Sequence, residues 1–340
     1  MCIRDRGSTF KILTAASALD SGVTTPQDSF YCSAKITVDG DTIRCWGRPH
    51  GAETMADGLK NSCNPVFVEL ALRMGTDTFY RYLTAFGLGK KTGIDLPGES
   101  PGILITSRNV KRVDLARIGF GQSVALTPIQ MMMAANSVIN GGKLMKPYIV
   151  SEIQTPDGET LERFHPTVMA APIRPETSDT MRLLLERVVS EGGGKNAAIA
   201  GYRIGGKTGT AQVYKNGRVV RDTHIGSFYG FAPVNDPQVS ILVIVKEADV
   251  PIDYGGTTAA PFARQIMQEM LPYLGIDPEN DEKDEEIEVP ALKGLTIGDA
   301  KRKLSQVGLE SVTDGANTVV LDQLPPAGAK LVKGGHVMLY

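Results

Sequence analysis

The sequence lacks a long hydrophobic segment and any marked excess of charge of one sign. Its longest apolar runs, such as 241–245, have five residues, far fewer than the roughly 20 that span a bilayer. The 36 basic and 38 acidic residues leave a net charge of −2, so the chain has no overall attraction to nucleic acid. The first six residues contain no apolar core of a secretory signal. We therefore expect no membrane span within this chain and no nucleic-acid partner.

Cysteine and histidine are also scarce, with four residues of each. Four cysteines among 340 residues are too few for a disulfide-built scaffold. No Cys-x-x-Cys pair or Cys/His cluster has the sequence spacing that is typical of a zinc site. We therefore expect no metal ion and no cofactor.

What is present indicates a soluble globular protein, with 42% apolar and 22% charged residues. A length of 340 residues favours about two domains. Acidic side chains crowd together over 277–286, where they solvate themselves and indicate a linker. We expect a body over 7–275, an acidic linker over 276–287 and a small tail domain over 288–340.

Local signals in the body predict helices before and after a set of strands. Thr127 and Pro128, with Gln130, form an N-terminal helix signal, and that helix is expected to end near Asn140. Further helices are expected over 176–190 and 260–273. Asn216 and Gly217 predict a hairpin turn. Strands are expected over 208–213, 218–221, 227–232 and 238–245. This order indicates an α+β fold with an antiparallel sheet.

Three short motifs carry possible chemistry. Ser8 and Lys11 lie three positions apart in a stretch expected to be helical, and so share one helix face. A serine becomes a good nucleophile when a neighbouring group takes its proton, and a lysine amine does so only when it is neutral. Burial and a second cation lower a lysine pKa in this way. The other motifs are Ser62-x-Asn64, in a turn between helices, and Lys207-Thr208-Gly209-Thr210, at a strand.

In this order, the three motifs resemble those of penicillin-recognising serine acyltransferases. The body resembles the transpeptidase domain of class B penicillin-binding proteins, and within them the sporulation-specific members. This resemblance implies the α+β penicillin-binding-protein/β-lactamase-like transpeptidase fold. Further similar stretches are 119–122, 127–130, 226–233, 254–256 and 260–261.

The resemblance also implies roles for the motif residues. Ser8 would attack the D-alanyl-D-alanine bond of a peptidoglycan stem peptide, and Lys11 would be its base. Ser62 would relay a proton to the leaving amine, and Asn64 would hydrogen-bond Lys11 and the substrate.

The downstream motif would complete the site. Lys207 would add a second positive charge. Thr208, Gly209 and Thr210 would bind the substrate, and the backbone N–H groups of Ser8 and Thr210 would form an oxyanion hole. β-Lactam antibiotics would acylate Ser8.

The implied function is a D-alanyl-D-alanine transpeptidase of spore cortex or septal wall synthesis, outside the cytoplasmic membrane and beside a glycosyltransferase partner. A β-lactamase or D,D-carboxypeptidase on the same fold, or a non-catalytic wall-binding scaffold, are alternatives. The family usually has Glu-Pro before this Gly-Ser motif, whereas Asp5 and Arg6 stand here. We therefore expect an N-terminally truncated chain whose first six residues are foreign and whose membrane anchor is absent.

The tail resembles one PASTA module, a small helix packed on a three-stranded sheet. The resemblance implies either contact with muropeptides or with the catalytic domain, or a role as a spacer.

Cysteine chemistry near the site gives a last expectation. Cys63 stands between Ser62 and Asn64, with Cys45 18 positions earlier in the chain. Thiols outside the cytoplasm tend to be oxidised. A reversible Cys45–Cys63 disulfide would distort the Ser-x-Asn loop and switch activity. A Cys32–Cys45 clip and free thiols are the alternatives.

Overall fold

The computed structural model describes residues 4–5, 7–215, 218–250, 253–278, 286–313 and 318–339. The chain forms two compact units, residues 1–184 and 185–340. Within the described ranges no helix is long and apolar enough to cross a membrane. The predicted Asn216–Gly217 turn, most of the predicted acidic linker (279–285) and four of the first six residues lie outside the described residues.

Helices make up the centre of the first unit. They are η1 (Gly7–Phe10, a 3₁₀ turn), α1 (Lys11–Asp20), α2 (Met55–Lys60), α3 (Asn64–Ala85), η2 (Ser107–Asn109), α4 (Arg112–Gly119) and α5 (Pro128–Ile139). α1 packs against α3 and α5. Nearly all of α1 is buried, because its side chains from Lys11 to Ala18 are enclosed on every face.

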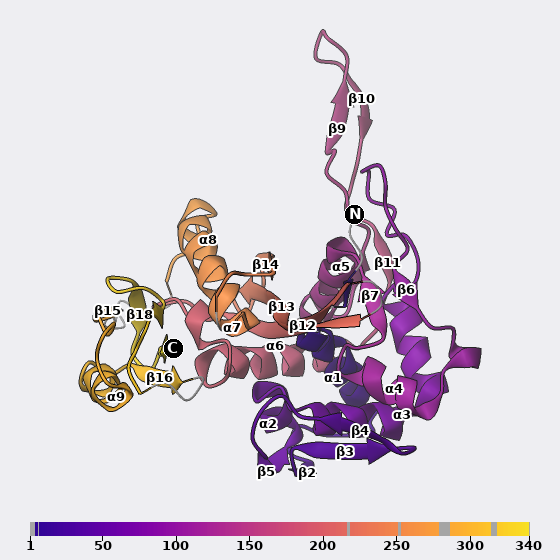
Figure 1. The fold of residues 1–340 in the computed structure, drawn as a ribbon. Coiled ribbons are helices and arrows are strands. Elements are labelled where there is room, and N and C mark those ends of the chain that lie inside the picture. The colour runs from indigo at the N-terminus through magenta and orange to yellow at the C-terminus, as the bar shows by residue number, and fades with distance from the viewer. Residues whose placement is uncertain are drawn as a thin grey trace. The chain divides into compact units, whose positions relative to one another are not determined.

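The first unit also contains short strands, each of which pairs antiparallel with its neighbour. They are β1 (Arg4–Asp5), β2 (Ser29–Cys32), β3 (Lys35–Val38), β4 (Asp41–Arg44), β5 (Gly51–Thr54), β6 (Ile103–Leu104), β7 (Val124–Leu126), β8 (Leu144–Met145), β9 (Glu152–Gln154), β10 (Thr160–Arg163) and β11 (Val168–Ala170). β7 lies between β1 and β6, β2 pairs with β5, and β3 pairs with β4. These last two pairs lie beside α2 and α3 (Figure 1).

The predicted start of α5 is confirmed. The Thr127 side chain accepts a hydrogen bond from the backbone of Gln130, and the Gln130 side chain accepts one from the backbone of Thr127. This reciprocal pair satisfies two of the N–H groups that a helix leaves free at its first turn. α6 (Pro175–Ser190), also expected, spans the division between the two units.

The second unit is built on a three-stranded antiparallel sheet in the order β12-β13-β14. The strands are β12 (Gly205–Lys215), β13 (Arg218–Ala232) and β14 (Val239–Lys246). The prediction of separate strands over 218–221 and 227–232 was wrong, because β13 is continuous. Gln212 pairs with His224 and Val213 with Val220, so the extra residues bulge out without ending the strand.

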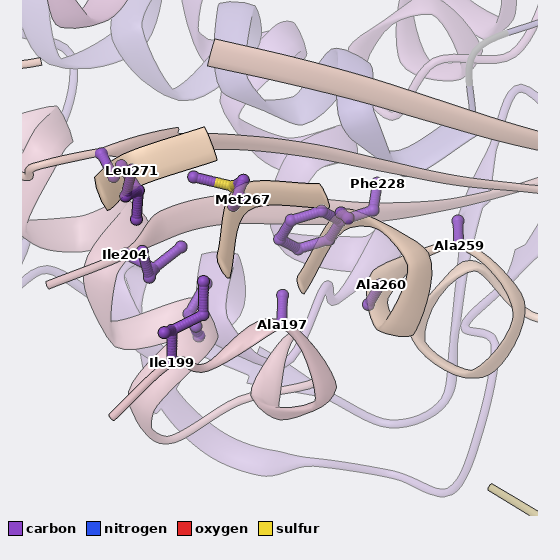
Figure 2. Close-up of a cluster of buried hydrophobic side chains, with 11 residues drawn as sticks. Ala197, Ile199, Ile204, Phe228, Ala259, Ala260, Met267 and Leu271 are labelled. Carbon is purple, nitrogen blue, oxygen red and sulfur yellow. The ribbon is translucent and has the colours of Figure 1, made fainter. Parts of the chain in front are cut away.

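Helix α8 (Ala260–Tyr273), predicted with these bounds, covers this sheet. Its apolar face joins the strands in one buried cluster, in which Met267 and Leu271 lie near Phe228 and Ile204 (Figure 2). η3 (Lys195–Ala197) adds Ala197 to the same cluster. This core holds β12 and β13 in place.

The tail has its own small core and the predicted helix, α9 (Ile297–Gln306). Its strands are β15 (Glu286–Glu288), β16 (Glu310–Thr313), β17 (Gln323–Leu324), β18 (Lys330–Val332) and β19 (His336–Leu339). β16, β19 and β17 form the expected three-stranded sheet. β15 and β18 form an additional pair that the sequence did not predict.

Candidate active site

Ser8 and Lys11 stand at the junction of η1 and α1. A 3₁₀ turn has three residues per turn, so positions three apart lie one above the other. Ser8 is half-buried, whereas Lys11 is completely buried. The structure therefore places the hydroxyl and the amine on neighbouring turns of one helical segment.

Gly121 packs against the backbone of this turn. Its φ is +90°, and a Cβ atom there would overlap the carbonyl oxygen of Gly7. Only glycine allows the two backbones to approach so closely. The position of the turn that carries Ser8 thus depends on the segment after α4.

The Lys11 amine is held by three hydrogen bonds to one short loop. Nζ donates to the backbone oxygen of Ser62 at 2.6 Å, to Oγ of Ser62 at 3.1 Å and to Oδ1 of Asn64 at 2.7 Å. The amide of Asn64 donates to the backbone oxygen of Arg44 at 3.0 Å, which fixes its orientation. The amine also lies 5.2 Å from the ring centre of Phe67. Lys11, Ser62 and Asn64 therefore form one hydrogen-bonded cluster in the first unit, one helical turn from Ser8.

The loop between α2 and α3 has an unusual backbone. Ser62 has a φ of +55°, in the left-handed region that non-glycine residues rarely adopt. The backbone N–H of Cys63 donates to Gly58 at 2.8 Å and returns the chain to the end of α2. Strain of this kind persists where surrounding contacts hold the backbone, and it is frequent at functional sites.

Burial changes the acidity of the amine. Loss of water around the charged form lowers the pKa of Lys11 to about 7. Coulombic interactions with Cys63, Cys45 and Glu53 act in the opposite direction and are weaker. A substantial fraction of Lys11 is thus neutral near neutral pH, and a neutral amine can accept a proton.

The third motif lies in the second unit, on the edge strand β12. The side chains of Thr208 and Thr210 share one face of the strand and are half-buried, whereas Lys207 points to the other face and is completely buried. Nζ of Lys207 donates to the backbone oxygen of Thr208 at 3.1 Å. That these residues complete the Lys11 cluster stays a prediction.

A short helix, α7 (Gly255–Thr258), packs closely on β12. The backbone N–H of Gly255 donates to Oγ1 of Thr210 at 3.3 Å. A Cβ atom on Gly255 would overlap backbone oxygens of Gly209 and Ser227. The stretch 254–256 singled out in the sequence therefore braces the Lys-Thr-Gly strand.

One group of side chains near the site was foreseen only in part, because the sequence singled out the three cysteines as possible partners but not His50. Potential ligand atoms of Cys32, Cys45, His50 and Cys63 all lie within 4.8 Å of one another. The expectation of no metal ion rested on sequence spacing, but the β2–β5 and β3–β4 pairings bring together residues that are separated in sequence. Cys32, Cys45 and Cys63 are all free cysteines in the structure. The Cys45–Cys63 disulfide stays a prediction.

Comparisons with known proteins identify the family of the chain. Residues 5–268 match the penicillin binding protein transpeptidase domain. The chain belongs to this family. Residues 287–340 match the PASTA domain. The α+β transpeptidase fold and the appended PASTA module that the sequence implied are thereby confirmed.

Among curated relatives, the chain is 41% identical to Stage V sporulation protein D of Bacillus subtilis, over 98% of this chain and 53% of that protein. It is 33% identical to penicillin-binding protein PbpB of Mycolicibacterium smegmatis, over 78% of this chain and 42% of that protein. The chain therefore spans about half the length of these relatives.

Solved structures show the same fold. Penicillin binding protein 3 from a Mycobacterium species, complexed with aztreonam, superposes with a TM-score of 0.75 at 27% identity, covering 81% of this chain and 64% of that one. The transpeptidase domain of penicillin-binding protein 3 from Burkholderia pseudomallei gives 0.73 at 27% identity, covering 82% of each chain.

Proposed function

We propose that residues 7–275 form a D,D-transpeptidase domain that cross-links peptidoglycan stem peptides through an acyl-enzyme on Ser8. The observation that carries this proposal is the Lys11 amine. It is completely buried, has a pKa of about 7, lies one turn from Ser8 and is held by Ser62 and Asn64. These are the properties that a general base for a serine nucleophile requires.

In the acylation step, Lys11 takes the proton of the Ser8 hydroxyl as the oxygen attacks the carbonyl carbon of the penultimate D-alanine. The bond to the terminal D-alanine breaks, and the leaving amine receives a proton through Ser62. An amine of a neighbouring stem peptide then attacks the ester, which forms the cross-link and returns the proton to Ser8. No cofactor enters this sequence of steps.

The hydrogen bonds of Lys11 fit this role. A neutral amine keeps two N–H donors and gains a lone pair. The two shortest bonds, to the backbone oxygen of Ser62 and to Asn64, hold the amine in place. The longer contact, to Oγ of Ser62, is then the path along which the proton moves to the leaving group.

The β12 motif supplies substrate binding in this proposal. Among the residues that the structure describes, β12 is an edge strand, so one row of its backbone groups has no strand partner and an extended peptide can bind there. Thr208, Gly209 and Thr210 would hold the substrate carboxylate and backbone, and Lys207 would supply positive charge. The N–H groups of Ser8 and Thr210 would form the oxyanion hole, where loss of one donor typically costs about 3 kcal/mol.

We extend the proposal to the biological role of the chain. We extend binding of β-lactams to this chain because a solved relative is complexed with aztreonam. The similarity to Stage V sporulation protein D favours spore cortex synthesis over septal synthesis. We place the domain at the outer face of the cytoplasmic membrane, beside a glycosyltransferase, with 276–287 as a linker and 288–340 as the PASTA domain.

A fluorescent penicillin tests the proposal. The chain is expected to become covalently labelled on the peptide that contains Ser8, and Ser8→Ala is expected to abolish labelling. Ser107→Ala, which removes an exposed hydroxyl of the same unit, is the matched control and keeps the label. Slow loss of the label supports a transpeptidase, whereas rapid turnover of penicillin identifies a β-lactamase. Equal labelling of Ser8→Ala and the unmodified chain refutes the proposal.

A further inference from the structure

Four side chains that the transpeptidase mechanism does not use lie directly beside its Ser-x-Asn loop. One nitrogen or sulfur atom from each of Cys32, Cys45, His50 and Cys63 lies within 4.8 Å of the other three. Sγ of Cys45 is 3.8 Å from Nδ1 of His50. Cys32 and Cys63 are completely buried, and the His50 side chain is 17% exposed.

The fold brings these residues together from four separate segments. Cys32 ends β2 and pairs with Gly51 of β5, the residue after His50. Cys45 follows β4, and its backbone N–H donates to the oxygen of Ala34 at 2.7 Å. Cys63 immediately precedes α3. The β3–β4 hairpin and the β2–β5 pair that encloses it are fixed by backbone pairing, and the backbone N–H of Cys63 donates to the oxygen of Gly58. The backbone therefore places the four side chains without a contribution from any ligand.

The spacing and the chemistry of the four groups fit one ion. In a tetrahedral zinc site, bonds of about 2.3 Å to sulfur and about 2.0 Å to nitrogen put the ligand atoms about 3.5–3.8 Å apart. The cluster is within about 1 Å of that spacing. Sulfur and imidazole ligands favour zinc, whereas magnesium and calcium prefer oxygen.

A second observation points to a cation at the same place. Oε1 of Glu53 is buried and has no hydrogen-bond partner among the residues that the structure describes. It lies 3.7 Å from Nδ1 of His50, while Oε2 accepts from Asn61 at 3.1 Å. A buried carboxylate oxygen without a partner is costly, and in zinc sites such a group accepts the free ring N–H of a metal-bound histidine, a role that His50 would fill here.

We propose that Cys32, Cys45, His50 and Cys63 bind one Zn²⁺ ion. Four protein ligands leave no open position, so the ion is structural and takes no part in the acylation chemistry. Glu53 lies outside the ligand set and acts as a supporting acidic group.

Hydrogen bonds connect the proposed zinc site to the loop that carries Ser62 and Asn64. Nε1 of Trp46 donates to the backbone oxygen of Asn61 at 2.9 Å, and the Asn64 amide donates to the backbone of Arg44. The residues on both sides of Cys45 therefore bind the loop that carries Cys63. Zinc bound to both cysteines holds this loop in the form that orients Lys11. This effect on acylation rests on the proposed function, whereas the binding of zinc does not.

Metal analysis of the unmodified chain, purified under reducing conditions, is the first test. One zinc per chain is expected after addition of excess zinc and removal of the unbound ion. Replacement by Co²⁺ is expected to give absorption from thiolate-to-cobalt charge transfer. This readout needs no substitution and no activity, so it holds even where a variant fails to fold.

Paired variants assign the ligands. His50→Ala is expected to lose zinc, and His165→Ala, at an exposed histidine of the same unit, keeps one equivalent. Cys32→Ser is expected to lose zinc although a Cys45–Cys63 disulfide would survive it. Glu53→Gln is expected to weaken zinc binding about 10-fold to 100-fold.

Two sets of results overturn the inference. One is a reduced chain that binds no zinc or cobalt. The other is binding that His50→Ala and Cys32→Ser leave unchanged. A chain that binds zinc but is not labelled by penicillin refutes the proposed transpeptidase and leaves the zinc site standing, and the reverse result refutes only the zinc site.

Discussion

The two sides of the segment Ser62-Cys63-Asn64 differ in how they are held. Ser62 and Asn64 face Lys11 and hold it through three hydrogen bonds. Cys63, between them, faces a cluster of sulfur and imidazole groups that lie within 4.8 Å of one another. The backbone changes from left-handed at Ser62 to extended at Cys63 and helical at Asn64, and one short loop thereby serves both clusters. Hydrogen bonds within the protein thus already order the side that faces Lys11. The side that faces the cysteines and His50 is the one proposed to bind zinc.

Removal of the Lys11 amine has the largest expected effect. It disrupts the hydrogen bonds of Lys11 and leaves the proposed zinc ligands in place. Lys11→Met is expected to slow acylation by benzylpenicillin about 10²-fold to 10⁴-fold, the usual contribution of a general base. Its zinc content stays at one equivalent, because all four ligands remain. Stopped-flow acylation and metal analysis measure both, with Lys143→Met, at an exposed lysine, as the control. Acylation by Lys11→Met within about tenfold of the unmodified rate contradicts the role of the amine.

A smaller effect is expected from displacement of the turn that carries Ser8. Gly121→Ala forces a Cβ atom against Gly7, which costs about 1–3 kcal/mol of overpacking beyond the strain of a positive φ. Gly141→Ala is the matched control, because Gly141 has a φ of +82° and open space around it. Denaturant unfolding is expected to show the larger loss for Gly121→Ala, together with slower acylation. Equal losses in the two variants contradict a packing role for Gly121.

The smallest expected effect links the two sides. Trp46→Phe removes the hydrogen bond to Asn61 and is expected to lower the free energy of unfolding by about 0.5–1.5 kcal/mol. Both the acylation rate and the zinc affinity are expected to fall, each by less than about tenfold. Tyr31→Phe changes an exposed aromatic residue of the same hairpin region and serves as control. A change in one property without the other shows that the two sides are independent.

Local signals in the sequence predicted much of the fold. The start of α5 and the span of α8 follow from capping residues and apolar spacing, which act over a few residues. Local signals did not predict the single long strand β13, because its bulge places polar residues inside the strand and resembles a loop in the sequence.

The two clusters beside Ser62 differ in the same way. Lys11, Ser62 and Asn64 were expected together because the order of their motifs resembles a known family. Cys32, Cys45, His50 and Cys63 match no local motif, since their spacing of 13, 5 and 13 residues reflects the pairing of hairpins and not one ligand loop. Contacts that depend on tertiary pairing leave no short-range pattern in a sequence.

The pH dependence of acylation by benzylpenicillin tests most directly whether Lys11 acts as a neutral base. Burial lowers its pKa to about 7, and the neutral form is the active one. The rate is therefore expected to rise about tenfold per pH unit below about pH 7 and to level off above it. Asn64→Asp puts a carboxylate beside the amine, so the midpoint is expected to move up by about 1–3 pH units, whereas the exposed control Asn109→Asp leaves it in place. A rate that does not change between about pH 6 and about pH 9, or a midpoint that Asn64→Asp leaves unmoved, contradicts the account.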